Sequence, residues 1–375
     1  MAGIYLHIPF CKQACHYCDF HFTTSLRGRD ELLDEMLHEL KMRSKELDDQ
    51  VVETIYFGGG TPSLLSYDEL MRFFEMIYTS FKMDAQAEIT MEANPDDLSK
   101  SYLKSLQKTP VNRLSVGVQS FRDEDLKSMN RAHHSEQALH CIPDAADVGF
   151  NNISLDLIFG WPHLEMDAWM KNVEIAFSLP ITHLSCYGLT IEPKTALAWQ
   201  ITKGVMDAPD DEKAALQYEY LLAESERLGF PWYEISNFSK PGFESKHNRA
   251  YWLGIPYLGI GPSAHSFDGN TRSSNVKSNG AYVAALQKGE REFETEVLKH
   301  GERFHEFILT SLRMRKGITL SVLRTLYGDG VTGQVLEAAQ TFVDKHWLIR
   351  DPDQLRLSIE GLLFADKITS ELFVI

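Results

Sequence analysis

Strands and helices alternate along the first 230 residues, and this alternation constrains the fold more than any other feature of the chain. Short apolar segments with strand character are each followed by a segment whose apolar residues recur at helical spacing. Such units form a parallel sheet covered by helices. We count six of them, fewer than the eight of a closed barrel, so we predict an α/β fold with an open, partial (β/α)6 TIM-like barrel. The expected strands cover residues 4–10, 54–57, 87–92, 113–118, 153–159 and 183–189, and the expected helices cover residues 29–47, 67–81, 98–106, 124–129, 135–148, 166–177 and 210–228.

Three cysteines follow the first expected strand with the spacing C-x3-C-x2-C, as Cys11, Cys15 and Cys18. Thiolates this close in sequence can converge on one metal centre. A 4Fe–4S cluster normally takes one Cys ligand for each of its four irons, so three ligands leave one iron open for another molecule. A structural zinc site is the alternative, and it closes with four ligands. The fourth zinc ligand would have to come from His7, His16, His21 or a distant residue.

The composition is that of an ordinary globular protein, with 43% hydrophobic and 24% charged residues. The formal net charge of −16 argues against broad electrostatic binding of nucleic acid. We expect no integral membrane segment, because no apolar run approaches the roughly 18 residues that a span needs. We also expect no signal peptide, and the cysteine usage favours a reducing cytoplasm. The remaining cysteines, Cys141 and Cys186, lie in apolar surroundings and are expected to be core residues.

Polar and glycine residues gather where the expected strands end. The run from Gly58 to Pro62 follows one strand, and Glu92, Gln119 and Asp156 close three others. Ligands bind at this edge of parallel α/β folds. A glycine run lets a ligand approach the bare backbone, although a tight turn would explain it equally well. A buried carboxylate needs a partner, which a bound cofactor would supply.

The rest of the chain departs from this alternation. We predict a core domain over residues 1–230, an irregular connecting segment over 231–295, and a smaller helical domain over 296–375. The last region combines helices with an expected hairpin around Asp351–Asp353, which is typical of a winged-helix-like domain. The acidic balance favours a packing role over DNA binding for this domain.

The motifs resemble those of the radical S-adenosylmethionine (SAM) enzymes, and within them the anaerobic coproporphyrinogen oxidase group. The resemblance covers most of the first 190 residues, in the same order. It implies that the three clustered cysteines hold a 4Fe–4S cluster and that SAM chelates its open iron. The segments that carry the resemblance are Ile8–Cys11, Gly58–Pro62, Glu92–Pro95, Gly117–Phe121, Asn130–Arg131 and Asp156–Ile158, whereas Trp161 departs from the usual Gly-Leu-Pro. The SAM contacts that the resemblance implies are Tyr5, Tyr17, Gly59, Gly60, Thr61, Glu92, Gln119, Arg131 and Asp156.

Two departures from the oxidases match the oxidase-like haem chaperones instead. The oxidases have a fourth cysteine where this chain has Phe20, and they carry a longer N-terminal extension before the cysteine loop. The segment from His247 to Trp252 also resembles the His-Asn-x-x-Tyr-Trp haem-binding motif of the chaperones.

The residue types of this motif suit haem. His247 can ligate iron, and Tyr251 and Trp252 offer flat apolar faces. Lys246 and Arg249 can pair with propionates. Without the resemblance, a loop with a capping histidine and two core aromatic residues would be the simpler interpretation. His265 is a further candidate ligand.

The sequence therefore predicts a cytoplasmic haem chaperone on a radical SAM barrel. It would carry haem to an acceptor protein, with no catalytic residues and no coproporphyrinogen oxidase activity. An electron donor is required if SAM is cleaved. The alternative is an oxygen-independent coproporphyrinogen III dehydrogenase, and a radical SAM enzyme acting on RNA is disfavoured by the negative charge.

Overall fold

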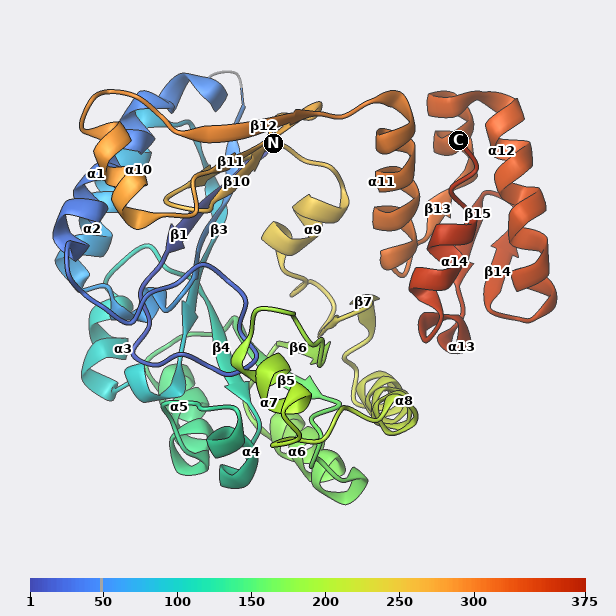
Figure 1. Ribbon diagram of the computed structural model, residues 1–375, viewed down its shortest axis with the longest axis horizontal. Coiled ribbons are helices and arrows are strands. Elements are labelled where there is room, and N and C mark those ends of the chain that lie inside the picture. Colours follow the sequence, from blue (N-terminus) through green and yellow to red (C-terminus); the bar gives the residue numbers. More distant parts are fainter. Residues whose placement is uncertain (48–49) are drawn as a thin grey trace.

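The computed structural model describes residues 1–47 and 50–375, and its centre is a parallel sheet wrapped by helices (Figure 1). The first six strands pair in chain order, each parallel to the next. Every one of the six strand–helix units expected from the sequence is present. The six strands are β1 (Ala2–Ile8), β2 (Val52–Gly59), β3 (Met83–Ala93), β4 (Arg113–Gln119), β5 (Ile153–Phe159) and β6 (His183–Gly188).

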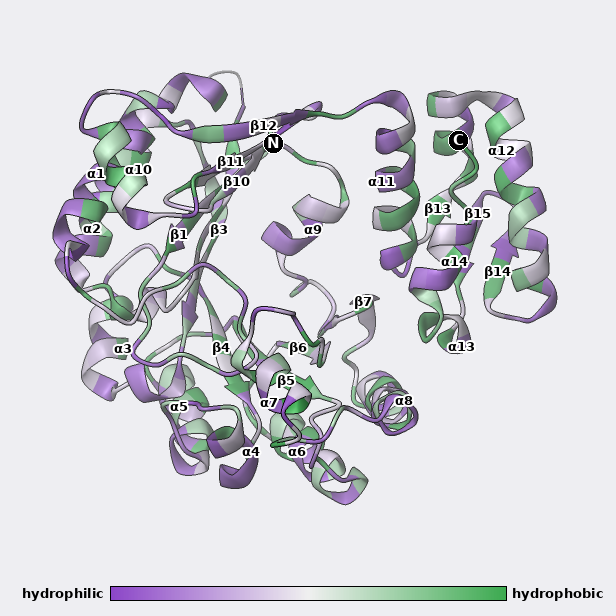
Figure 2. Cartoon of the chain, viewed as in Figure 1, coloured by the Kyte–Doolittle hydropathy of each residue, from purple (hydrophilic) through white to green (hydrophobic). Residues whose placement is uncertain are grey.

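The helices pack on the outside of this sheet with their apolar faces inward. Helix α2 (Tyr67–Ser80) is an example: a capping box between Ser66 and Glu69 fixes where it begins. It buries Leu70, Phe73, Phe74 and Ile77. Figure 2 accordingly shows hydrophobic (green) and hydrophilic (purple) residues on the same outer helices. The other helices of the repeat are α1 (Arg29–Met42), α3 (Lys100–Leu106), α4 (Asp123–Ser128), α5 (Ser135–Asp147), α6 (Met166–Ser178) and α8 (Asp211–Arg227).

Two details differ from the expected helices. The helix expected to run to residue 47 ends at Met42, and a 3-10 turn, Ser44–Leu47, follows it. The buried Arg43 guanidinium binds Glu39 and the Gly259 carbonyl there. An additional helix, α7 (Ala196–Thr202), begins at the capping residue Thr195.

The segment expected to be irregular contains short strands that extend the sheet at both ends. They are only three to five residues long, too short to show a clear alternation in the sequence. Among the described strands the order is β12-β11-β10-β9-β1-β2-β3-β4-β5-β6-β8-β7, so β12 and β7 are edges and the barrel stays open. The elements are β7 (Trp232–Glu234), β8 (Asn237–Ser239), α9 (Lys246–Trp252), β9 (Tyr257–Ile260), β10 (His265–Phe267), β11 (Thr271–Asn275), α10 (Asn279–Leu286) and β12 (Phe293–Val297).

The C-terminal region forms a separate group of helices with a small sheet, beside the open side of the barrel (Figure 1). Helix α12 joins two helical segments across a kink at Gly328, whose φ of 84° is left-handed. The expected hairpin is present as β14 and β15. The elements are α11 (His300–Arg313), β13 (Ile318–Thr319), α12 (Leu320–Asp344), β14 (Leu348–Asp351), β15 (Gln354–Leu357), α13 (Ile359–Leu362) and α14 (Ala365–Glu371). In the described ranges no helix has the length and apolar character of a membrane span.

Candidate functional site

The three clustered cysteines lie in the loop between β1 and α1, and their thiols are free and partly exposed. Backbone hydrogen bonds fix this loop: the Cys11 N–H donates to the Thr23 carbonyl at 3.0 Å, and the His16 N–H donates to the Met129 carbonyl at 3.0 Å. Burial raises the pKa of the Cys18 thiol to about 12. A metal that binds here therefore has to displace protons, and its positive charge makes that exchange favourable.

The alternative of a zinc site needs a fourth ligand beside the three cysteines. In the described part of the chain, no three His, Cys, Asp or Glu side chains gather as the ligands of one metal ion. Each histidine considered as a fourth zinc ligand has at least one ring nitrogen engaged with a protein oxygen. His7 and His16 each place a ring nitrogen 2.8–2.9 Å from a backbone carbonyl, and His21 contacts Asn279 at 2.7 Å.

A cavity of about 450 Å³ opens beside the cysteines, at the carboxyl edge of the sheet. This is the edge at which the sequence predicted a ligand site. The cavity is lined by all three cysteines and by eight of the nine residues expected to contact SAM, namely Tyr17, Gly59, Gly60, Thr61, Glu92, Gln119, Arg131 and Asp156. The ninth, Tyr5, lines a larger neighbouring cavity instead.

The glycine run brings bare backbone to this cavity. A Cβ on Gly60 would meet the Ile8 and Phe10 carbonyl oxygens at 2.7 Å, so a side chain has no room there. Gly59 has a φ of 105°, and its N–H donates to Glu92 Oε2 at 3.2 Å. The close backbone contacts at the cavity wall therefore require glycine in this run, whether or not the chain turns here.

Four carboxylates, of Asp19, Glu92, Asp156 and Glu192, and the guanidinium of Arg131 line the smaller cavity. Burial raises the pKa of Glu92 to about 7 and that of Asp156 to about 6. Arg131 donates to the Gly117 carbonyl at 2.7 Å and lies 3.4 Å from both Cys15 Sγ and the Tyr17 hydroxyl. A ligand with an amine, hydroxyls and a carboxylate would find partners here for each of these groups.

The backbone at Gln119 is strained. Its φ is 68°, which few residues other than glycine adopt, and it lies at the point where β4 ends in the cavity wall. Such strain persists where the surrounding structure holds it, often at ligand sites.

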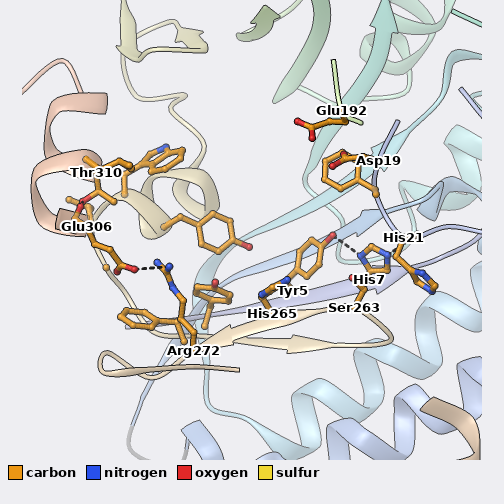
Figure 3. A pocket seen from close by; sticks show the side chains of 18 of the residues that line it. Tyr5, His7, Asp19, His21, Glu192, Ser263, His265, Arg272, Glu306 and Thr310 are labelled. Carbon is orange, nitrogen blue, oxygen red and sulfur yellow. Dashed lines mark hydrogen bonds and ion pairs between the residues drawn. The ribbon is translucent and has the colours of Figure 1, made fainter. Parts of the chain in front are cut away.

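A second cavity, of about 2110 Å³, lies between the open side of the barrel and the C-terminal helices. The segment Cys15–Phe22 borders both cavities, through Cys15, Cys18, Asp19, Phe20 and Phe22. Figure 3 shows the larger cavity, with Tyr5, His7 and His21 on one side and Thr310 and Glu306 on the other. A ligand in the larger cavity would thus lie next to the cysteine loop.

The residues predicted to bind haem are divided by the fold. Tyr251 and Trp252 line the larger cavity. His247, on the first turn of α9, is 2% exposed and lines neither cavity. Its Nδ1 lies 2.8 Å from the Thr54 hydroxyl oxygen and its Nε2 lies 2.9 Å from that of Tyr251. Both ring nitrogens are therefore engaged within the protein.

The remaining predicted residues of this segment lie elsewhere. Lys246 donates through Nζ to the Gln86 carbonyl at 3.2 Å, and neither Lys246 nor Arg249 lines the larger cavity. His265 does line it, and its side chain is exposed.

Four residues that line the smaller cavity were not among the predicted site residues. Ser115, Ser185 and Tyr187 belong to it, as does Asn248 of α9. The first three could have been found from strand alternation, because side chains two residues apart on a strand face the same side. Ser115 lies four residues before Gln119 on β4, and Ser185 lies two residues before Tyr187 on β6. Asn248 belongs to the His-Asn-x-x-Tyr-Trp motif, but its place at the smaller cavity was not predicted, because α9 approaches the barrel from a distant part of the chain.

Known proteins resemble this chain along its whole length. The sequence profile described as the Radical SAM superfamily matches residues 5–175. The "Heme chaperone HemW" of Bacillus subtilis is 34% identical over 371 residues, which cover 98% of this chain and 98% of that protein. The "Radical S-adenosyl methionine domain-containing protein 1, mitochondrial" of Danio rerio is 30% identical, covering 98% of this chain and 86% of that protein.

Among solved structures, the coproporphyrinogen III oxidase HemN from Escherichia coli superimposes with a TM-score of 0.86. The alignment covers 100% of this chain and 90% of that one at 21% sequence identity. At this level of identity the likeness concerns the fold alone.

Proposed function

We propose that this chain, which belongs to the radical SAM superfamily and within it to the HemW subgroup of the HemN-like family, binds haem and transfers it to an acceptor protein. The observation that carries the proposal is the large cavity with aromatic walls beside the cysteine loop. Haem is a broad, mostly apolar molecule that requires room, flat contacts and a few cations. The full-length relatives named as haem chaperones support the same conclusion.

Membership of the superfamily implies a 4Fe–4S cluster and SAM as cofactors. We assign the cluster to Cys11, Cys15 and Cys18, which border the smaller cavity. When reduced, such a cluster supplies the electron that cleaves SAM. SAM would be oriented by the Gly59–Thr61 backbone, by the side chains of Glu92, Gln119, Arg131 and Asp156, and by Tyr17 of the cysteine loop.

The assignment of a carrier rather than an oxidase rests on Phe20. In this structure Phe20 is 67% exposed and lines both cavities, where the oxidases are expected to have a fourth cysteine. An apolar ring at this boundary offers a contact for a porphyrin face and no ligand for a metal.

Three assays on one preparation test the proposal. Cluster-loaded protein is titrated with haem and its Soret band is followed. The haem-loaded protein is then mixed with a globin apoprotein, whose own spectrum reports transfer. In the third assay, anaerobic protein with SAM and a reductant is given coproporphyrinogen III. We expect haem binding and transfer without conversion to protoporphyrinogen IX. Efficient conversion would contradict the chaperone assignment even if haem binds.

A further inference from the structure

His265 differs from the other histidines of the large cavity. His7, His16 and His21 each place a ring nitrogen within 2.9 Å of a protein oxygen. For His265, no side-chain hydrogen bond is found within the described part of the chain, and its ring is exposed to the cavity. The ligating ring nitrogen of a histidine has to be accessible and unengaged, although the other nitrogen is usually hydrogen-bonded to the protein. His265 is accessible, and both of its ring nitrogens are open to a ligand.

The hairpin of β10 and β11 fixes the direction of this ring. Phe267 pairs with Arg272 across the two antiparallel strands, and His265 lies two residues before Phe267, so the three side chains share one face. Ser266, on the opposite face, is buried, where its hydroxyl accepts from the Gly259 N–H at 2.9 Å and from Arg43 at 3.0 Å. Because Ser266 is anchored on the inside, His265 is directed into the cavity (Figure 3).

Two cations lie near His265. Arg272 pairs with Glu306 at 2.6 Å, and its guanidinium lies 5.8 Å from the centre of the Phe267 ring. Lys277 also lines the cavity and has no ion pair within the described residues. Partial desolvation within the cavity, with the positive charges of Lys277 and Arg272, lowers the pKa of His265. A neutral imidazole is the form that ligates iron, and propionates require cations such as these.

Apolar side chains cover the opposite walls. Leu253, Leu309, Val322 and Leu326 are 43–55% exposed, and all four line this cavity. Exposed apolar residues that converge on one cavity from α11, from α12 and from the residue that follows α9 mark a site for an apolar ligand. The volume of about 2110 Å³ exceeds the usual range of roughly 300–1,000 Å³ for small-molecule pockets, so a macrocycle has room to enter and leave.

We infer that His265, rather than His247, is the axial ligand of haem bound in the large cavity, and that Arg272 and Lys277 hold its propionates. This inference rests on the proposed haem binding and adds its ligand and orientation. The macrocycle would lie against Tyr251, Trp252 and the apolar wall, next to the cysteine loop. His247 is then a positioning residue that holds α9 in place.

Haem titration of four proteins tests this assignment: the full-length wild type, His265→Ala, Lys277→Gln and the control His140→Ala, whose exposed histidine on α5 lines neither cavity. Removal of a residue that hydrogen-bonds to a metal ligand typically costs 10–100-fold in affinity for the metal. Removal of the ligand itself should therefore weaken haem binding at least about tenfold. We expect the Soret band and the ferric electron paramagnetic resonance spectrum to change in His265→Ala and added imidazole to restore them. Lys277→Gln should weaken binding and reduce its salt dependence, and the control should match the wild type.

The outcomes separate this inference from the proposed function. If the wild type binds no haem, the proposed function itself fails. If the wild type binds haem and His265→Ala binds it with the same affinity and spectrum, the ligand assignment is wrong while haem binding stands. Urea denaturation of His265→Ala checks that the variant is folded. Loss of the spectrum in a stably folded variant that imidazole rescues supports His265.

Discussion

The Nε2 atom of His247 lies 2.9 Å from the hydroxyl oxygen of Tyr251, one turn later in α9. The other ring nitrogen contacts Thr54 on β2, and the ring stacks on Tyr56 with 4.9 Å between centroids. A Cβ on Gly3 would come within 3.3 Å of the same ring, so β1 leaves room for it. The pair thus ties α9 to the interior of the barrel.

We predict that His247→Ala destabilises the protein. The change leaves Thr54 and Tyr251 without their buried partner, which typically costs about 1–3 kcal/mol. Urea denaturation of wild type and variant measures this free energy of unfolding. His140→Ala, an exposed histidine, should leave it within about 0.5 kcal/mol of the wild type. A His247→Ala protein as stable as the wild type would contradict the anchoring role.

The cysteines allow a sharper prediction about iron. Anaerobically reconstituted protein should hold about four irons per chain, and changing Cys11, Cys15 or Cys18 to Ala should abolish the cluster. Cys141 and Cys186 are 3% and 1% exposed and line neither cavity, so their replacement by Ala should leave the iron content unchanged. Iron analysis and the visible spectrum measure both. Iron retained in the Cys11, Cys15, Cys18 triple variant would rule out this site.

Most of the barrel could be predicted because its signals are local. The apolar run of each strand and the spaced apolar residues of each helix lie within 20 residues, and the polar strand ends follow from the topology. This is why Glu92, Gln119 and Asp156, far apart in sequence, were expected at one edge and lie around one cavity.

The orientation of the side chains in the segment from His247 to Trp252 could not be predicted in the same way. Its residue types suited haem, but whether His247 faces a cavity or the core depends on contacts with Thr54 and Glu88, which belong to distant strands. Glu88 accepts from the His247 N–H at 3.1 Å and so draws the start of α9 into the barrel. The short strands β10 and β11, which present His265 and Arg272, gave no periodicity to detect.

Asp156 provides a test of the SAM site. It lies on β5 beside Ser115 and Ser154, at 3.4 and 3.5 Å, and lines the smaller cavity with the cysteines. Asp156→Ala should weaken SAM binding by about five- to 150-fold, the range expected for a buried polar contact of roughly 1–3 kcal/mol. Equilibrium dialysis measures this affinity at equal iron content. Asp366→Asn, exposed on α14, is the matched control, and unchanged affinity in Asp156→Ala would exclude Asp156 from the site.

The raised pKa of Glu92 leads to a prediction of how the stability of the cofactor-free protein depends on pH. Burial raises its pKa from 4.5 to about 7, with the nearby charge of Asp156 acting in the same direction. The folded protein therefore holds a proton here that the unfolded chain releases above pH 4.5. Stability from this group is fully present below pH 4.5 and is lost as the pH rises towards about 7.

Glu92→Gln removes this titration, so the variant should gain stability relative to the wild type as the pH rises. The pKa difference of about 2.5 units corresponds, at about 1.4 kcal/mol per unit, to a change of about 3 kcal/mol in the stability difference between the two proteins from pH 4.5 to pH 8. Urea denaturation of both proteins at these two pH values measures it. Glu136→Gln, an exposed residue on α5, should differ from the wild type by the same amount at both. A Glu92→Gln protein whose stability runs parallel to the wild type across this range would show that the pKa of Glu92 is not raised in the folded protein.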